Sequence, residues 1–146
     1  DNCPEELFTV LMRRLMVKIA NRICAANDYG AIITGESVAQ VASQTLPAIF
    51  CTNAAAEYPV FRPVIGMDKR EIVDVARHID TFEVSTLPYE DCCTVFSPKH
   101  PKTRPSLEEI LAAEASFDFE PLIEKAVRET EVKQFKYGVR NVDLDM

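Results

Sequence analysis

Apolar residues recur at helical spacing over the first part of the chain. Between residues 4 and 27, leucine, valine and isoleucine return every three or four positions, and Pro4 suits a first helical turn. The pattern predicts one long amphipathic helix. A basic flank accompanies the apolar stripe, and we interpret it as a solvated face in preference to an anion-binding one; it comprises Arg13, Arg14, Lys18 and Arg22.

Short apolar runs further along the chain predict strands. Residues 31–34 form an uncharged run typical of a buried parallel strand, and residues 60–64 have the pattern of a strand that ends at a proline. Residues 49–51 and 83–87 are further strand candidates.

Three predicted helices start with the residue spacing of a capping box, in which two side chains three positions apart bond each other's backbone N–H groups. The starts are Ser37, Asp68 and Ser106, and the first of these helices is predicted to run to Pro47. The second carries an apolar stripe that is predicted to be buried, formed by Ile72, Val75, Ala76 and Ile79.

A last helix is predicted from about residue 121 to 131, followed by a tail over 132–146. Alternating strands and helices indicate an α/β fold with a mainly parallel sheet. A doubly wound sheet has more strands than the pattern supplies, so we expect the first βαβ unit to be missing.

Charged residues at the predicted strand ends are candidates for ligand contact. The turn at 35–37 follows a strand directly, and ligands of α/β proteins bind at such turns, although Glu36 would repel a phosphate. Arg62 is either a surface charge or a charge directed at a ligand. Lys69 stands in a first helical turn, where the dipole disfavours a cation, so it is either solvent-exposed or paired with an anion.

Two adjacent thiols, Cys92 and Cys93, lie in the proline-rich segment 88–105. This segment has no long apolar periodicity, and we interpret it as an ordered loop that carries reactive chemistry; two buried, inert cysteines are the alternative. Adjacent cysteines rarely bond to each other, so at least one is expected to be free to attack or to accept sulfur.

Composition limits the class of protein. The 146 residues fit one domain, 47% of them are hydrophobic, and no apolar run approaches the length of a membrane span, so no membrane partner is expected. The net charge of −7 argues against a nucleic-acid clamp within this chain. Five cysteines without a CxxC motif indicate a reduced, cytoplasmic protein and no metal site. Because residue 1 is Asp, we expect a piece of a longer protein.

Four blocks of the sequence together resemble one family. Residues 34–37, 40–46, 62–69 and 88–105 are similar, in order and spacing, to the tRNA 4-thiouridine synthetases, the tRNA sulfurtransferases also called thiamine biosynthesis protein ThiI. The resemblance covers about residues 10–130. It implies an adenine nucleotide alpha-hydrolase-like, PP-loop (Rossmann-like) parallel sheet with flanking helices, incomplete at the N-terminus, with residues 1–131 as the later part of that domain.

The resemblance also implies an activity. Members use ATP, with Mg²⁺, to adenylate a uridine in tRNA; a persulfide loaded by a cysteine desulfurase then displaces AMP and leaves 4-thiouridine. Some members also supply sulfur for the thiazole of thiamine. tRNA would be held by domains absent here, and a homodimer is compatible with the family. Two alternatives stay open, a non-catalytic sulfur-relay domain and a PP-loop enzyme that acts on a small molecule.

The family's functional residues fall on specific positions of this chain. The sulfur-carrying cysteine aligns with Cys93, and Cys92 is its neighbour; Lys69 would stabilise the adenylated intermediate. The implied nucleotide-binding residues are Gly35, Glu36 and Gln44, and the implied substrate or phosphate contacts are Arg62 and Asp68. The family's Ser-Gly-Gly-x-Asp-Ser loop is absent from this sequence, so we expect the chain alone to bind ATP poorly.

Overall fold

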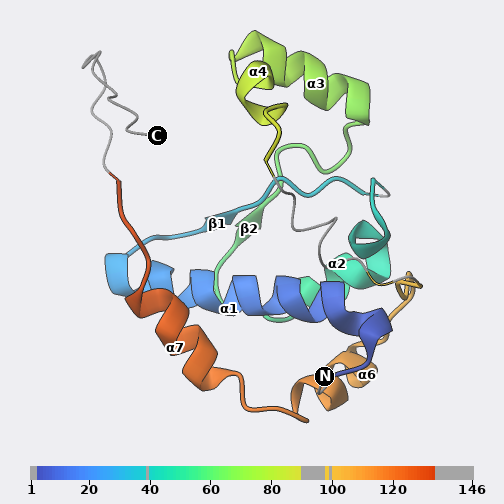
Figure 1. Ribbon diagram of the computed structural model, residues 1–146, viewed down its shortest axis with the longest axis vertical. Helices are drawn as coiled ribbons and strands as arrows, with labels where there is room; N and C mark the ends of the chain where they lie inside the picture. Colours follow the sequence, from blue (N-terminus) through green and yellow to red (C-terminus); the bar gives the residue numbers. More distant parts are fainter. Residues whose placement is uncertain (1–2, 39, 90–97, 99, 134–146) are drawn as a thin grey trace.

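One long helix spans the molecule (Figure 1). The computed structural model describes residues 3–38, 40–89, 98 and 100–133. A short 3₁₀ turn, η1 (Glu5–Leu7), leads into α1 (Phe8–Asn27). The helix ends where Asp28 adopts a left-handed conformation with φ of 56° and donates its N–H to the Cys24 carbonyl. The predicted long helix is therefore confirmed.

A parallel two-stranded sheet lies beside α1. Strand β1 (Ile32–Ile33) pairs with β2 (Val60–Phe61), with Ile32 opposite Val60 and Ile33 opposite Phe61. Both strands fall within the predicted runs at 31–34 and 60–64. The connection between them carries α2 (Leu46–Asn53), as a parallel pair requires a crossover.

The segment between β1 and α2 differs from the prediction. The helix predicted from Ser37 to Pro47 is wrong: the described residues there form turns and a 3₁₀ helix, η2 (Ala42–Gln44). The Ser37 hydroxyl donates to the Met67 carbonyl at 2.7 Å, so it caps no helix. Thr45 caps α2 instead, and Pro47 lies in its first turn. The strand predicted at 49–51 is also wrong, because those residues belong to α2.

Two helices form a separate hairpin, α3 (Lys69–His78) and α4 (Phe82–Ser85). The capping box of Asp68 and Glu71 is present as predicted. The strand predicted at 83–87 is wrong, since α4 occupies most of it. The predicted burial of the α3 stripe is also wrong: no residue of α3 is buried, because α3 and α4 pack on each other and stand apart from α1 (Figure 1).

The last two helices pack against α1 (Figure 1): α6 (Leu107–Glu114) and α7 (Glu120–Arg128). Ser106 and Glu109 form the predicted capping box of α6. The main core cluster lies where α1, α2 and α6 meet, and a second lies between α1 and the sheet; the first is formed by Leu7, Val10, Leu11, Ala48, Cys51, Ile110 and Ala113, and the second by Val17, Cys24 and Ile32.

Two of the predictions fall outside the described residues. Cys92 and Cys93 lie in the segment 90–97, and most of the tail predicted at 132–146 lies beyond residue 133.

Candidate functional site

A buried carboxylate lies immediately after the carboxyl end of β1. Glu36 is 3% exposed, and its two oxygens accept hydrogen bonds from three side chains. Arg13 of α1 donates from Nη2 to Oε1 at 2.6 Å. Arg62, just after β2, donates from Nε to Oε2 at 2.7 Å, and Thr34 donates from Oγ1 to the same oxygen at 3.0 Å. Glu36 thus joins α1, β1 and β2 at one end of the sheet.

The charge of this cluster is positive. Burial opposes the ionisation of Glu36, but the hydrogen bonds from Arg62 and Arg13 outweigh it and hold the pKa of the carboxyl below its ordinary value. One carboxylate therefore faces two guanidinium groups, and the cluster carries a net charge of about +1. The repulsion of a phosphate, expected from Glu36 alone, is cancelled by the two arginines.

Arg62 connects the cluster to α2. Its Nη2 donates to Oδ1 of Asn53 at 3.0 Å, and its Nη1 donates to the carbonyl of Val60 at 3.4 Å. The guanidinium is therefore held in one orientation by an ion pair and two further hydrogen bonds. Of the two sequence interpretations of Arg62, a free surface charge does not fit this arrangement.

Gln44 and the turn at 35–37 are tied together. The backbone N–H of Ser37 donates to Oε1 of Gln44 at 3.0 Å, and the N–H of Val38 donates to the Ile65 carbonyl at 3.0 Å. Gly35 is exposed, and a Cβ at that position would meet nothing within 4 Å. Hydrogen bonds to Gln44 and to the 62–67 segment thus hold the end of the turn, while Gly35 is exposed.

Asp68 and Lys69 begin α3. The Asp68 carboxylate accepts from the backbone N–H groups of Arg70 at 2.8 Å and Glu71 at 2.9 Å, so in this structure it acts as a helix cap. Lys69 is exposed in the first helical turn. Both follow Met67 directly, and Met67 is the residue whose carbonyl receives the Ser37 hydroxyl.

The structure brings four of the predicted residues to one turn. Glu36 and Arg62 are hydrogen-bonded to each other, Gly35 directly precedes Glu36, and Gln44 accepts from the backbone N–H of Ser37, the next residue. Asp68 and Lys69 are joined to it through the chain, whereas Cys92 and Cys93 lie outside the described residues. Arg13 and Asn53 belong to the network and were not predicted as site residues. No local sequence pattern predicts their roles, because Arg13 is 23 positions from its partner Glu36 and Asn53 is 9 positions from its partner Arg62.

The interpretation of the basic flank of α1 as a solvated face is wrong for the buried Arg14 and holds for Arg22, which is 59% exposed. Arg14 is buried; it pairs with Glu114 of α6 at 2.9 Å and donates to the Cys51 carbonyl at 2.5 Å. Lys18 pairs with the same carboxylate at 2.8 Å, and Arg22 pairs with Glu120 of α7 at 2.6 Å. Burial opposes ionisation of Glu114, yet the Arg14 and Lys18 bonds hold its pKa below the ordinary value. Arg14, Lys18 and Arg22 thus link α1 to the last two helices.

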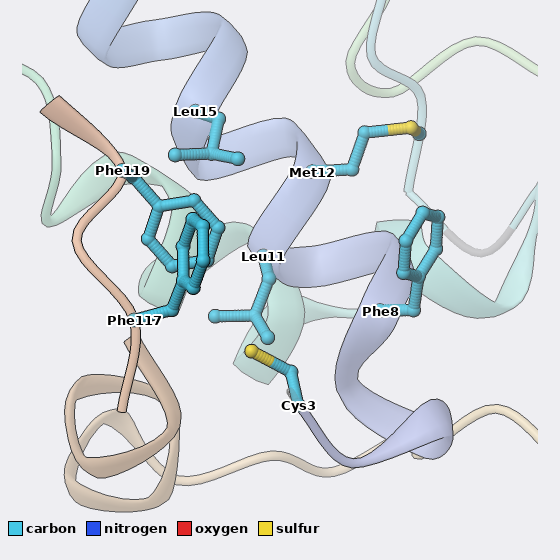
Figure 2. Close-up of a pocket in the computed structure, with 7 residues that line it drawn as sticks. All are labelled: Cys3, Phe8, Leu11, Met12, Leu15, Phe117 and Phe119. Atoms are coloured by element: carbon cyan, nitrogen blue, oxygen red, sulfur yellow. The ribbon is translucent and has the colours of Figure 1, made fainter. Parts of the chain in front are cut away.

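An apolar pocket of about 250 Å³ lies between α1 and the segment that follows α6 (Figure 2). The rings of Phe117 and Phe119 meet edge to face in it, with centroids 4.9 Å apart. Its lining contains none of the residues around Glu36 and no charged side chain; it consists of Cys3, Phe8, Leu11, Met12, Leu15, Phe117 and Phe119. We assign it no chemistry.

Within the described residues, no group of three or more histidine, cysteine, aspartate or glutamate side chains could hold a metal ion. In the same part of the chain, every helix is too short or too polar to cross a lipid bilayer.

A parallel βαβ unit with a charged network at the strand ends is typical of a Rossmann-like α/β domain. A solved structure described as a 4-thiouridine synthetase–RNA complex with bound ATP has this fold: it superposes with a TM-score of 0.81 and 36% identity, over 88% of this chain and 34% of that one. The family described as "Thiamine biosynthesis protein (ThiI)" matches residues 1–119, and the chain belongs to it. The expected fold and family are thereby confirmed.

Curated relatives agree with this assignment. A probable tRNA sulfurtransferase of Alkaliphilus oremlandii is 53% identical over 134 residues, which are 92% of this chain and 34% of that protein. A second, from Caldanaerobacter subterraneus subsp. tengcongensis, is 54% identical over 124 residues, or 85% and 33% of the two chains. The chain thus spans about a third of the length of the relatives that it matches.

Proposed function

We propose that this chain is part of an ATP-dependent tRNA sulfurtransferase that makes 4-thiouridine in tRNA. One observation carries the proposal: the match to a 4-thiouridine synthetase with bound RNA and ATP covers 88% of the chain at 36% identity. The relatives named probable tRNA sulfurtransferase support the same reaction. Because the chain spans only a third of their length, the activity belongs to the longer protein.

ATP fits the network around Glu36. An anionic nucleotide needs positive charge and close backbone approach, and the network offers a net charge of about +1 beside the exposed Gly35. In our proposal the Gly35–Glu36 turn lines the nucleotide cleft, with Gln44 holding the turn in place. In the same proposal Arg62 and Asp68 contact the substrate or the phosphates. Mg²⁺ would arrive with the phosphates, since the described residues offer no carboxylate cluster for it.

The sulfur chemistry is assigned to the cysteine loop. Uridine O4 attacks the α-phosphorus of ATP and releases pyrophosphate, which leaves an adenylated base. Cys93 carries sulfur as a persulfide, and its terminal sulfur attacks C4 of the base as AMP departs, which leaves a disulfide between the base sulfur and Cys93. A second thiol then attacks the Cys93 sulfur, which releases 4-thiouridine and leaves Cys93 in a disulfide with that thiol. Lys69 stabilises the negative charge that develops on the departing phosphate, which is consistent with its exposed place at the start of α3.

The partners follow from this reaction. A cysteine desulfurase would load the persulfide, tRNA would be held by the part of the protein outside this chain, and the protein would act in the cytoplasm, where thiols stay reduced. Cys3, Cys24 and Cys51 are all free thiols here, in agreement with a reducing compartment. We also propose that the full-length protein is a homodimer. The family's description also favours a second role, sulfur supply for the thiazole of thiamine.

The test is 4-thiouridine formation in tRNA by the full-length protein, with Cys93→Ser and Cys92→Ser as a matched pair. We expect Cys93→Ser to abolish the product and Cys92→Ser to retain it. Loss in Cys92→Ser alone would move the carrier to the neighbouring thiol. Absence of product in the wild-type protein would refute the tRNA reaction.

A calorimetric titration tests whether ATP binding requires the part of the protein outside this chain. The family's Ser-Gly-Gly-x-Asp-Ser loop is absent from the 146 residues, so we expect them to bind ATP much more weakly than the full-length protein does. Micromolar affinity of the 146-residue chain would contradict this.

A further inference from the structure

The Thr45 hydroxyl makes two hydrogen bonds at once. It accepts from the backbone N–H of Ala48 at 3.3 Å, and this bond caps α2. It also donates to the carbonyl of Thr103 at 2.6 Å, 58 positions along the chain. A helix cap needs only an acceptor, which aspartate supplies at least as well as threonine does. The cap therefore does not account for the second bond, which requires a proton to donate.

The carbonyl that accepts from Thr45 lies in the segment 102–105, which other elements also hold. The backbone N–H of Lys102 donates to the carbonyl of Glu6 in η1 at 3.0 Å. The ammonium group of the same lysine pairs with Glu109 of α6. Because these bonds do not involve α2, the segment stays attached to η1 and α6 when the bond to Thr45 is removed.

The residue before Thr45 holds the candidate nucleotide turn. Gln44 accepts from the backbone N–H of Ser37 at 3.0 Å. Consecutive Cα atoms lie about 3.8 Å apart, so these two adjacent side chains bind the turn at 35–37 and the segment 102–105 to one short stretch of backbone. The end of η2 and the start of α2 thereby couple the two.

The segment 102–105 follows the cysteine pair in the sequence, and Cys93 is ten positions before Thr103. In the reaction proposed above, the persulfide meets a uridine that has been adenylated at the nucleotide turn. Sulfur transfer then depends on how these two parts of the chain are placed, and a misplacement of about 1 Å can cost about 10²-fold in rate. Adenylation takes place before the cysteine takes part, so it does not share this dependence.

We propose that Thr45 is a positioning residue for sulfur transfer. Its hydroxyl holds the chain that follows the cysteine pair at a fixed position relative to the turn that lines the nucleotide cleft. The inference rests on the reaction proposed above and adds to it a residue that acts through the backbone of Thr103.

Two substitutions in the full-length protein separate the two bonds of Thr45. Thr45→Asp keeps an acceptor for the cap of α2 but has no proton for the Thr103 carbonyl, whereas Thr45→Ser keeps both. Thr130→Asp is the control for the added charge, because Thr130 is exposed and its hydroxyl donates to the Ala126 carbonyl one turn earlier.

Each variant is assayed in a single turnover with tRNA, ATP, a cysteine desulfurase and cysteine. Release of pyrophosphate reports adenylation, and 4-thiouridine reports the complete reaction. We expect Thr45→Asp to slow 4-thiouridine formation at least about tenfold while pyrophosphate release stays within about twofold of the wild-type rate. Thr45→Ser and Thr130→Asp should match the wild-type protein in both rates. An equal fall of both rates in Thr45→Asp, or 4-thiouridine formation at the wild-type rate, would overturn the proposal.

Amide exchange of the same full-length variants, without tRNA or ATP, tests the bond independently of the reaction. Loss of one hydrogen bond, worth about 1 kcal/mol, should make the N–H of Lys102 exchange about fivefold faster in Thr45→Asp. The N–H of Ala48 should keep its protection, because aspartate still caps α2. Unchanged exchange at Lys102 would overturn the inference and leave the proposed reaction intact. Absence of 4-thiouridine in the wild-type protein would instead refute the reaction, and the positioning role with it.

Discussion

Replacing Glu36 with glutamine removes one negative charge from a buried network and leaves its shape almost unchanged. The carboxylate accepts three hydrogen bonds, two of them from guanidinium groups. Glutamine keeps one oxygen, but its amide group points a donor at an arginine that is itself a donor. The substitution therefore leaves both Arg13 and Arg62 without their counter-charge.

The magnitude follows from the burial of the three side chains. Breaking a fully buried ion pair costs about 3–5 kcal/mol. Here the arginine side chains keep 21% and 15% of their exposure and recover part of that cost by hydration. We therefore expect a loss of about 2–3 kcal/mol in the free energy of unfolding. With a urea dependence of about 1–3 kcal/mol/M, the midpoint falls by about 0.7–3 M.

The assay is urea unfolding followed by circular dichroism, at pH 7 and at lower pH. Glu36 has a folded-state pKa below its ordinary value of 4.5, so its contribution is present above that value and is lost as the pH falls through the folded-state pKa. The gap between wild type and Glu36→Gln should therefore close below pH 4.5. Glu83→Gln, an exposed carboxylate on α4, is the control and should leave the midpoint unchanged. A Glu36→Gln midpoint equal to that of wild type at pH 7 would refute the reasoning.

Two further predictions concern the helix starts. Lys102, together with the backbone and hydroxyl of Ser106, lowers the pKa of Glu109 to about 2. An NMR titration of the wild-type protein should find that pKa, and Lys102→Ala should raise it. An unchanged pKa of Glu109 in the variant would contradict the role of Lys102. Asp68→Ala removes the N-cap of α3, which contributes about 1 kcal/mol to stability. Because α3 buries no residue, we expect amide exchange to accelerate in α3 and α4 alone. Faster exchange in α1 would show that the hairpin is coupled to the core.

The sequence alone predicts a helix start correctly where the hydrogen-bond partners of the capping residues are close in the chain. The capping pairs at Asp68 and Ser106 each satisfy their N–H groups within three residues, and both predicted helices formed. The same spacing at Ser37 failed because its hydroxyl bonds a carbonyl 30 residues away, which no local pattern reveals. The uncharged run at 31–34 identified β1, whereas the short apolar stretch at 49–51 fits a helix as well as a strand.

In the candidate site, too, the sequence predicts some residues and does not predict those whose partners are distant in the chain. A strand–turn–helix pattern and a family resemblance predict Gly35, Glu36, Gln44 and Arg62 as site residues. In the structure Glu36 bonds Arg62, and Gln44 bonds the residue that follows Glu36. The sequence does not predict the role of Arg13, since this residue belongs to a basic flank whose pattern indicates a solvated face. The partners of its four cations are Glu36, Glu114 and Glu120, and the last two come from the far end of the chain.

The pairing of Arg14 with Glu114 has a consequence for synthesis on the ribosome. The two residues are 100 positions apart, so the first long helix can form early, but its buried guanidinium has no counter-ion until α6 has left the exit tunnel. A nascent chain that stops before residue 114 would have to hydrate Arg14, and hydration opposes the docking of α1 on α2. Completion of the core is thereby postponed until almost the whole domain has been translated, during which time the apolar stripe of α1 is accessible to chaperones.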